Sequence, residues 1–273
     1  MTLDQALDAM RAHIDPKRAV ESAAYHKQTR EVLGVSNPVL NDLTKAWRKE
    51  LSVEERVALA DALWNTDIFE ARIAAAKLLT QARMRPDEGA WELIKSWVPQ
   101  FDSWAIADHA CMAGQKRLIA DPSRLDEVEE WVSAAPWPDT LWTRRAALVI
   151  TLPWTKQNNP KPEEQEARER ILGWVAGMTS LKHGAMQKAV AWWLRDLSKH
   201  DADRVRTFLM EHGITMKAFA VKEAGRHIGF TPEDVPAPIA GELSDEVETD
   251  MSMAPAGIND DDNTPTDTAS EEE

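Results

Sequence analysis

The sequence is almost without cysteine, because Cys111 is the only one among 273 residues. A single cysteine excludes a disulfide framework and a zinc site built on cysteines, and it fits a reducing compartment. No stretch approaches the roughly 18 consecutive apolar residues that cross a membrane. The polar, amphipathic start "MTLDQALDAMRAHID" also lacks the apolar centre of a signal peptide. We therefore expect a cytoplasmic protein with no membrane partner.

Basic residues are missing from the last part of the chain, where residues 231–273 hold fourteen Asp and Glu and no Lys or Arg. The net charge of −14 therefore belongs to this segment, since residues 1–230 balance 32 acidic side chains with 32 basic ones. This segment has few large apolar residues and many Pro, Asp, Glu and Thr. The apolar surface that it could bury is too small to offset the conformational entropy lost on ordering. The sequence predicts a folded domain over residues 1–230 and a disordered acidic tail over residues 231–273.

Familiar catalytic motifs are absent as well. The sequence has no Gly-rich phosphate-binding loop, no metal-spaced pair among its seven histidines and no serine nucleophile elbow. We therefore expect neither a metal nor a cofactor.

What the sequence does contain is helical periodicity over almost all of residues 1–230, with no convincing strand. Start signals support it: Thr2 with Gln5 and Ser52 with Glu55 have capping-box spacing, and Asn37 precedes a proline as a capping residue does. The predicted helices cover residues 3–14, 17–33, 38–50, 53–64, 68–84, 88–97, 102–114, 122–134, 140–153, 162–178, 181–199, 202–212 and 216–226.

This succession of helices, each about 10 to 19 residues long, predicts an all-α fold. Without long heptads, such helices are typical of stacked antiparallel pairs, as in HEAT-like or armadillo-type α-solenoids. A globular helical bundle is the alternative. A curved solenoid would provide a concave surface for a long partner such as a duplex, although a fold does not by itself identify its partner.

Tryptophan is the unusual component, with twelve Trp against one Tyr and five Phe. Large aromatic residues in helices are most often part of the core, so the informative ones are those near charges. Trp104 stands four residues before Asp108 and Trp192 three before Arg195, spacings that put both members on one helix face. An ordinary surface stack of Trp on Arg is the alternative reading of the second pair.

Five segments in order along the chain carry a resemblance to a known family: "AYHKQTREVLGVSNP", "FEARIAAAKLL", "SWAIADHAC", "LWTRRAALV" and "QKAVAWWLRDLSK". Together they resemble the DNA alkylation repair family, which are helical-repeat DNA glycosylases that remove N3- and N7-alkylated purines. The similarity covers most of residues 15–230. It implies duplex DNA containing alkylated purines as the partner, a role in base excision repair, and a nucleoid-associated location in the cytoplasm. We expect a monomer.

The resemblance also implies roles for individual residues. Asp108 corresponds to the family's catalytic carboxylate, and Trp104 and Trp192 to the aromatic residues that flank the nucleotide. Without the resemblance, Asp108 would be read as an ordinary helix carboxylate. Its predicted roles are to stabilise the cationic transition state and to orient water.

Four further residues are expected to contact DNA. The resemblance implies Arg145 as a phosphate ligand and places Tyr25, within "AYHK", in the same cleft. Arg195 and Lys188 belong to a basic stretch between residues 182 and 199. Two other functions remain open at this point: a helical-repeat protein that binds DNA without cleaving it, and a protein-binding scaffold.

Overall fold

The computed structural model describes residues 1–236. The chain divides into two units, Met1–Pro238 and Ile239–Glu273, and the second unit lies outside the described residues. Most of the predicted acidic tail, residues 237–273, therefore lies outside them as well. Within the described part, Pro232–Asp234 form a short 3-10 helix. The side chain of Val235 packs on Gly213, since a Cβ added to this glycine would lie 2.9 Å from a methyl carbon of Val235. The folded unit thus reaches beyond the predicted boundary at residue 230.

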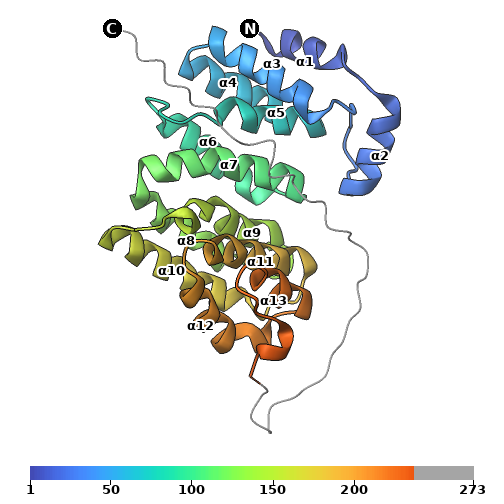
Figure 1. Cartoon of the computed structure of the whole chain (residues 1–273). Coiled ribbons are helices and arrows are strands. Elements are labelled where there is room, and N and C mark those ends of the chain that lie inside the picture. The colour runs from blue at the N-terminus through green and yellow to red at the C-terminus, as the bar shows by residue number, and fades with distance from the viewer. Residues whose placement is uncertain (237–273) are drawn as a thin grey trace. The chain divides into compact units, whose positions relative to one another are not determined.

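The described residues form an all-α fold, as predicted, and each predicted segment corresponds to one helix (Figure 1). The only β-structure among residues 1–236 is an isolated bridge between Glu31 and Ile68. The α-helices are α1 Leu3–Arg11, α2 Pro16–His26, α3 Asn37–Glu50, α4 Val53–Trp64, α5 Phe69–Leu79, α6 Glu88–Trp97, α7 Trp104–Ala120, α8 Leu125–Val132, α9 Leu141–Ile150, α10 Pro162–Met178, α11 Gly184–Ser198, α12 Ala202–His212 and α13 Ala218–Ala224. The 3-10 helices are η1 Val98–Gln100, η2 Pro122–Arg124, η3 Leu152–Lys156, η4 Gly213–Thr215 and η5 Pro232–Asp234.

Local chemistry explains where several helices begin. Both capping boxes are confirmed: in the first, Thr2 Oγ1 accepts from the Gln5 backbone N at 3.3 Å, and Gln5 Oε1 accepts from the Thr2 backbone N at 2.9 Å. The prediction for Asn37 is wrong by one residue, because Ser36 occupies the N-cap and Asn37 is the first helical residue.

The largest errors in helix bounds have tertiary causes. Helix α7 continues six residues past the predicted end at Gly114, because this glycine serves close packing rather than chain termination. A Cβ at this position would lie 2.5 Å from Cδ1 of Ile150. Helix α2 ends at His26 rather than at residue 33, and Lys27 takes a left-handed conformation with φ 52°.

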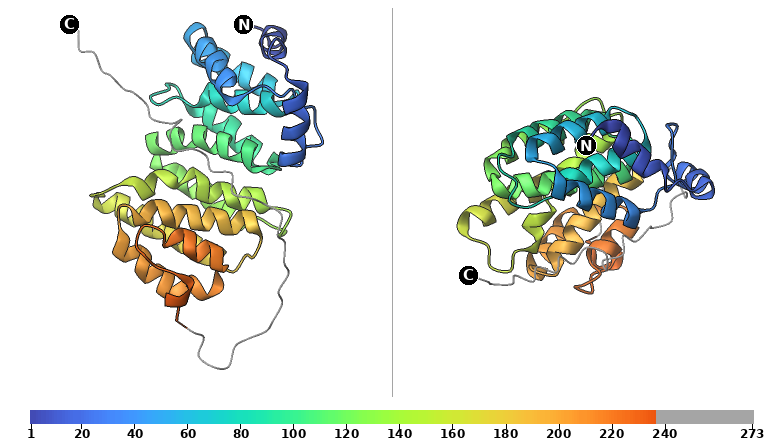
Figure 2. Two further views of the ribbon diagram at one scale, coloured as in Figure 1. Left: turned by 45° about the vertical axis from the view of Figure 1, so that its right-hand side comes forward. Right: turned by 90° about the horizontal axis from the view of Figure 1, so that it is seen from above.

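The helices stack as a HEAT-like solenoid of two layers (Figures 1 and 2). Layer A consists of α5, α7, α9, α11 and α13, each packed against the next, and layer B consists of α4, α6, α8, α10 and α12. The stacking shows a repeat near 36 residues that is hidden in the sequence. Trp64 Nε1 donates to Gln100 and Trp91 Nε1 to Glu127, both across a separation of 36 residues.

The helices of layer A run parallel. Between α7 and α9, Asp108 is hydrogen-bonded to Arg145, and Gln115, further along α7, is hydrogen-bonded to Val149, further along α9. The two helices therefore run in the same direction. Between α11 and α13 the same order holds, since Gln187 bonds with Lys217 before Arg195 bonds with Glu223. The bond from Arg145 to the Ala185 carbonyl joins the first halves of α9 and α11. Helices α7, α9, α11 and α13 therefore begin at one edge of the stack, here called the N-terminal edge.

Tryptophan forms much of the core, as the sequence predicts. Seven of the twelve are buried, and Trp64 stacks on Trp97 with ring centroids 4.3 Å apart. The five partly exposed ones include Trp104 and Trp192. No helix within residues 1–236 combines the length and the apolar character needed to span a membrane.

Candidate functional site

The centre of the candidate site is an ion pair between two helices of layer A. Arg145 of α9 donates to Asp108 of α7 through both sides of its guanidinium, with Nε 3.1 Å from Oδ1 and Nη2 2.8 Å from Oδ2. The side chains are only 7% and 6% exposed, and Arg145 Nη1 also donates to the Ala185 carbonyl of α11 at 2.7 Å. The pair therefore fixes three neighbouring helices and holds the carboxylate in one orientation.

This arrangement bears on the role expected for Arg145. Its bonds to Asp108 and to the Ala185 carbonyl use all three nitrogens of the guanidinium, and its side chain is buried. In this structure Arg145 positions Asp108. Its contact with phosphate stays a prediction. The neighbouring Cys111 offers no nucleophile, because burial, helped by the charge of Asp108, raises the pKa of its thiol well above the ordinary value.

Trp104 is the first residue of α7, one turn before Asp108, and it is half-buried. The ring of Tyr25 lies edge-on to it with centroids 6.1 Å apart, and the ring of His26 lies 4.9 Å away. His26 in turn packs against Phe69 at 5.0 Å. We call these four residues the aromatic cluster. The structure thus brings Tyr25 to Trp104, while sequence reasoning missed His26 and Phe69.

Helix α2 reaches the site because the loop after it is held firmly. Glu70 of α5 is buried and accepts from the backbone N of Leu33 at 2.8 Å and of Gly34 at 2.7 Å. Gly34 has a φ of 76°, and a Cβ there would lie 2.1 Å from the Asp15 carbonyl oxygen. Only glycine allows this contact between the loop and the start of α2. The last turn of α2, where Tyr25 remains 46% exposed, therefore lies beside the beginnings of α5 and α7 (Figure 1).

Lys188 and Trp192 lie on the face of α11 that meets α9. Ala185, which accepts the bond from Arg145, precedes them by three and seven residues, a spacing that keeps all three on one side of a helix. Burial lowers the pKa of Lys188, and the charge of Arg145 acts in the same direction. The structure therefore places Lys188 near the central ion pair, with the half-buried Trp192 one turn further along.

Arg195 has a different environment from the one expected. Its guanidinium lies 2.6 Å from Glu223 and 3.4 Å from Asp196, and Asp196 also accepts from Trp192 Nε1 at 3.1 Å. Two carboxylates already offset its charge, so the structure favours a role for Arg195 in orienting Trp192 through Asp196. Contact between Arg195 and DNA stays a prediction.

His109 directly follows Asp108, and its pKa reports how strongly water is excluded at this position. Burial, reinforced by the charge of Lys77, lowers the pKa of His109 to about 4, and its Nδ1 lies 2.6 Å from the Ala105 carbonyl oxygen. In the unfolded chain His109 takes up a proton near pH 6.5, whereas in the folded chain it does so only near pH 4. Stability is therefore complete above pH 6.5 and falls as the pH drops toward 4.

We expect this histidine to cost the wild type about 2 kcal/mol of unfolding free energy between pH 7 and pH 5. The variant His109→Gln keeps a donor for the Ala105 carbonyl and should lack this loss. Urea denaturation of both proteins at the two pH values measures the difference. An equal pH dependence for the two would show that His109 takes up its proton in the folded state as well.

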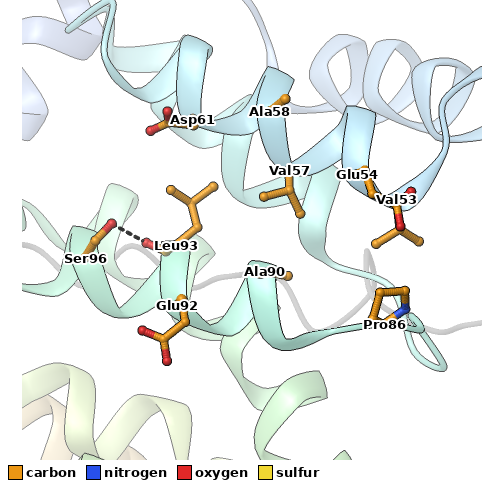
Figure 3. A pocket seen from close by; sticks show the side chains of 11 residues that line it. Val53, Glu54, Val57, Ala58, Asp61, Pro86, Ala90, Glu92, Leu93 and Ser96 are labelled. Atoms are coloured by element: carbon orange, nitrogen blue, oxygen red, sulfur yellow. Dashed lines mark hydrogen bonds between the residues drawn. The ribbon is translucent and has the colours of Figure 1, made fainter.

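A groove between α4 and α6 of layer B is separate from this site (Figure 3). Its floor is apolar, with Val57 and Leu93, and its rim carries three carboxylates, Glu54, Asp61 and Glu92. An acidic rim repels phosphate, so this groove is not part of a surface for nucleic acid.

Comparisons with known proteins identify the family. A model of the family described as DNA alkylation repair enzyme matches residues 6–228. No curated protein matches the chain.

Two solved structures have a similar fold. A protein from Enterococcus faecalis described as a predicted DNA alkylation repair enzyme is 21% identical, with a TM-score of 0.65 over 79% of this chain and 97% of its own. AlkD2 from Streptococcus mutans is 19% identical, with a TM-score of 0.53 over 77% of this chain and 97% of its own. At this identity the two structures support the solenoid fold alone.

Proposed function

The chain belongs to the DNA alkylation repair enzyme family, and we propose that it is a DNA glycosylase acting on cationic N3- and N7-alkylated purines in duplex DNA. In this proposal it hydrolyses the N-glycosidic bond and begins base excision repair. The observation that carries the proposal is the carboxylate of Asp108, fixed by Arg145 one turn from the half-exposed ring of Trp104.

The substrate explains why a carboxylate is the group required. Alkylation at N3 or N7 makes the purine cationic, so the base leaves as a neutral molecule while positive charge grows on the deoxyribose. A carboxylate about 4 Å from that charge contributes up to about 4 kcal/mol at an effective dielectric near 20. Since each 1.4 kcal/mol or so is tenfold in rate, Asp108 would account for up to about 10³-fold.

The aromatic residues have a complementary role in this proposal. An indole face attracts a cation by about 0.5–2 kcal/mol, depending on how well water is excluded. Trp104 and Trp192 would flank the nucleotide and contact its sugar and cationic base, and Tyr25 would line the same side as Trp104. Because alkylation has already activated the base, the reaction needs no metal or cofactor to activate it further.

Asp108 would also orient the attacking water. Each of its oxygens accepts one bond from Arg145, and a carboxylate oxygen has capacity for a second. Arg145 acts as a positioning residue, since it fixes the plane of the carboxylate. Lys188, near this pair, would contact a phosphate beside the lesion.

One observation favours a second candidate, a protein that binds DNA without cleaving it. Asp108 is only 4% exposed, and both of its oxygens are bonded to Arg145. If the bound nucleotide does not reach the carboxylate, the surface would hold a duplex, with strong salt dependence, but release no base.

Release of free base distinguishes the two candidates. We expect the full chain to liberate base from duplexes carrying a single N7-methylguanine or N3-methyladenine, measured by chromatography of the supernatant against time and against spontaneous loss. Time-dependent release that scales with protein concentration supports the glycosylase. Duplex binding without any release above the spontaneous rate would overturn it in favour of the binding protein.

A further inference from the structure

Two lysines from different repeats lie together at the N-terminal edge of layer A. Lys182 precedes α11 and Lys217 precedes α13. The Nζ of Lys182 donates to the Thr215 carbonyl, two residues before Lys217, at 2.7 Å. Burial lowers the pKa of Lys182, and the positive charge of Lys217 lowers it further.

A buried glutamine holds the two segments that carry these lysines. Gln187 is fully buried and donates to the carbonyls of Thr179 at 2.7 Å and Leu181 at 3.0 Å, next to Lys182. Its Oε1 accepts from the backbone N of Lys217 at 2.8 Å. One side chain thus fixes both backbone segments, so the positions from which the two lysines project are held close together by the fold.

Nothing in the described part of the chain neutralises this charge. Within residues 1–236 neither Lys182 nor Lys217 has an ion-pair partner, whereas Arg195, near the other end of α11, is paired with Glu223. Two apolar side chains within three residues of Lys217 in the sequence are exposed: Ile214 is 50% exposed and Phe219 is 44% exposed. Two cations without an ion-pair partner among the described residues, beside exposed apolar groups, indicate a surface that binds an anion carried on a larger partner.

The position of this pair relates it to the central ion pair. Layer A places α7, α9, α11 and α13 side by side in that order, and neighbouring helices lie 8–10 Å apart. The two lysines, between α11 and α13, are therefore roughly 20–25 Å from Asp108. With 3.4 Å per base pair, that distance corresponds to about six or seven base pairs of B-form DNA.

We propose that Lys182 and Lys217 form a second phosphate-binding site, which holds the duplex about six or seven base pairs to one side of the damaged nucleotide. The proposal rests on DNA being the partner, as the proposed function states. The pair anchors flanking duplex and takes no part in bond cleavage.

The salt dependence of duplex binding tests this site. The variant Lys182→Gln/Lys217→Gln removes two phosphate contacts, so the slope of log affinity against log salt should become shallower by about 1.8. Between 50 and 200 mM salt the variant should then lose about tenfold less affinity than the wild type. The matched control is Lys156→Gln/Lys161→Gln, which removes two exposed lysines beyond the opposite end of α9 and should keep the wild-type slope.

Duplex length locates the contact. We would use one duplex with twelve base pairs on both sides of the lesion and two others shortened to three base pairs on one side or the other. Only one of the two shortened duplexes should bind the wild type more weakly. With that duplex, the affinities of the wild type and the lysine variant should no longer differ. A wild-type slope in the lysine variant, or a difference that survives both truncations, would overturn the proposal.

These outcomes are independent of catalysis. If the wild type releases no base but the lysine variant binds with a shallower slope, the phosphate site stands and the glycosylase function fails. If base is released and the slope is unchanged, only the phosphate site fails.

Discussion

Replacing Asp108 with asparagine is expected to slow the release of N7-methylguanine by about 10²–10³-fold, while binding of the damaged duplex is retained. Asparagine keeps the shape of the side chain and removes the negative charge that would stabilise the developing sugar cation. Single-turnover release with protein in excess isolates the chemical step from product release. Fluorescence anisotropy of the same duplex gives the affinity.

The fold supplies a matched control for this experiment. Asp87 and Arg124 form another two-pronged pair, with Oδ2 and Oδ1 of Asp87 at 3.0 and 3.1 Å from the guanidinium, on the flank of layer B. Asp87→Asn removes a carboxylate of the same kind away from the candidate site and should leave the rate of base release unchanged. Equal rates in wild type and Asp108→Asn would mean that Asp108 is structural, and equal losses in both variants would point to a general effect on folding.

The sequence predicts the fold well because most of the information is local. Helical periodicity and capping residues such as Thr2 and Ser52 act within one or two turns, so they can be read without knowing the tertiary structure. The errors occur where a residue far away in the sequence determines where a helix ends. Gly114 continues a helix because Ile150 of the next repeat lies against it, and nothing near Gly114 in the sequence signals that contact.

The same division applies to the candidate site. The spacing of Trp104 and Asp108 places them on one face of a helix, and the resemblance to a family supplies their expected roles. The partner of Asp108 stands 37 residues away, at a separation set by how the repeats stack. Sequence reasoning therefore names Arg145 and predicts that it contacts phosphate, but it does not reveal the pair with Asp108. His26 could have been found only from its place beside Tyr25 in "AYHK", which carries no sign that its ring packs on Trp104.

The central ion pair should also dominate stability, and this second large effect can be separated from catalysis. Asp108→Asn and Arg145→Gln each leave one member of a buried pair without its partner, and each should lower the free energy of unfolding by about 3–5 kcal/mol. The double variant leaves no unpaired charge. Its loss should be smaller than the sum of the two single losses by about 1–3 kcal/mol. Urea denaturation of the four proteins completes the cycle, and strictly additive losses would mean that the two side chains do not interact in solution.

Activity in the same four proteins should not follow stability. If Asp108 acts on the sugar cation, the double variant regains part of its stability but remains as slow as Asp108→Asn, because the required charge is still missing. Arg145→Gln keeps that charge while loosening its orientation, so it should release base faster than either variant lacking the carboxylate. Recovery of base release in the double variant, in step with its stability, would instead assign the pair a purely structural role and leave the chemistry to other residues of the site.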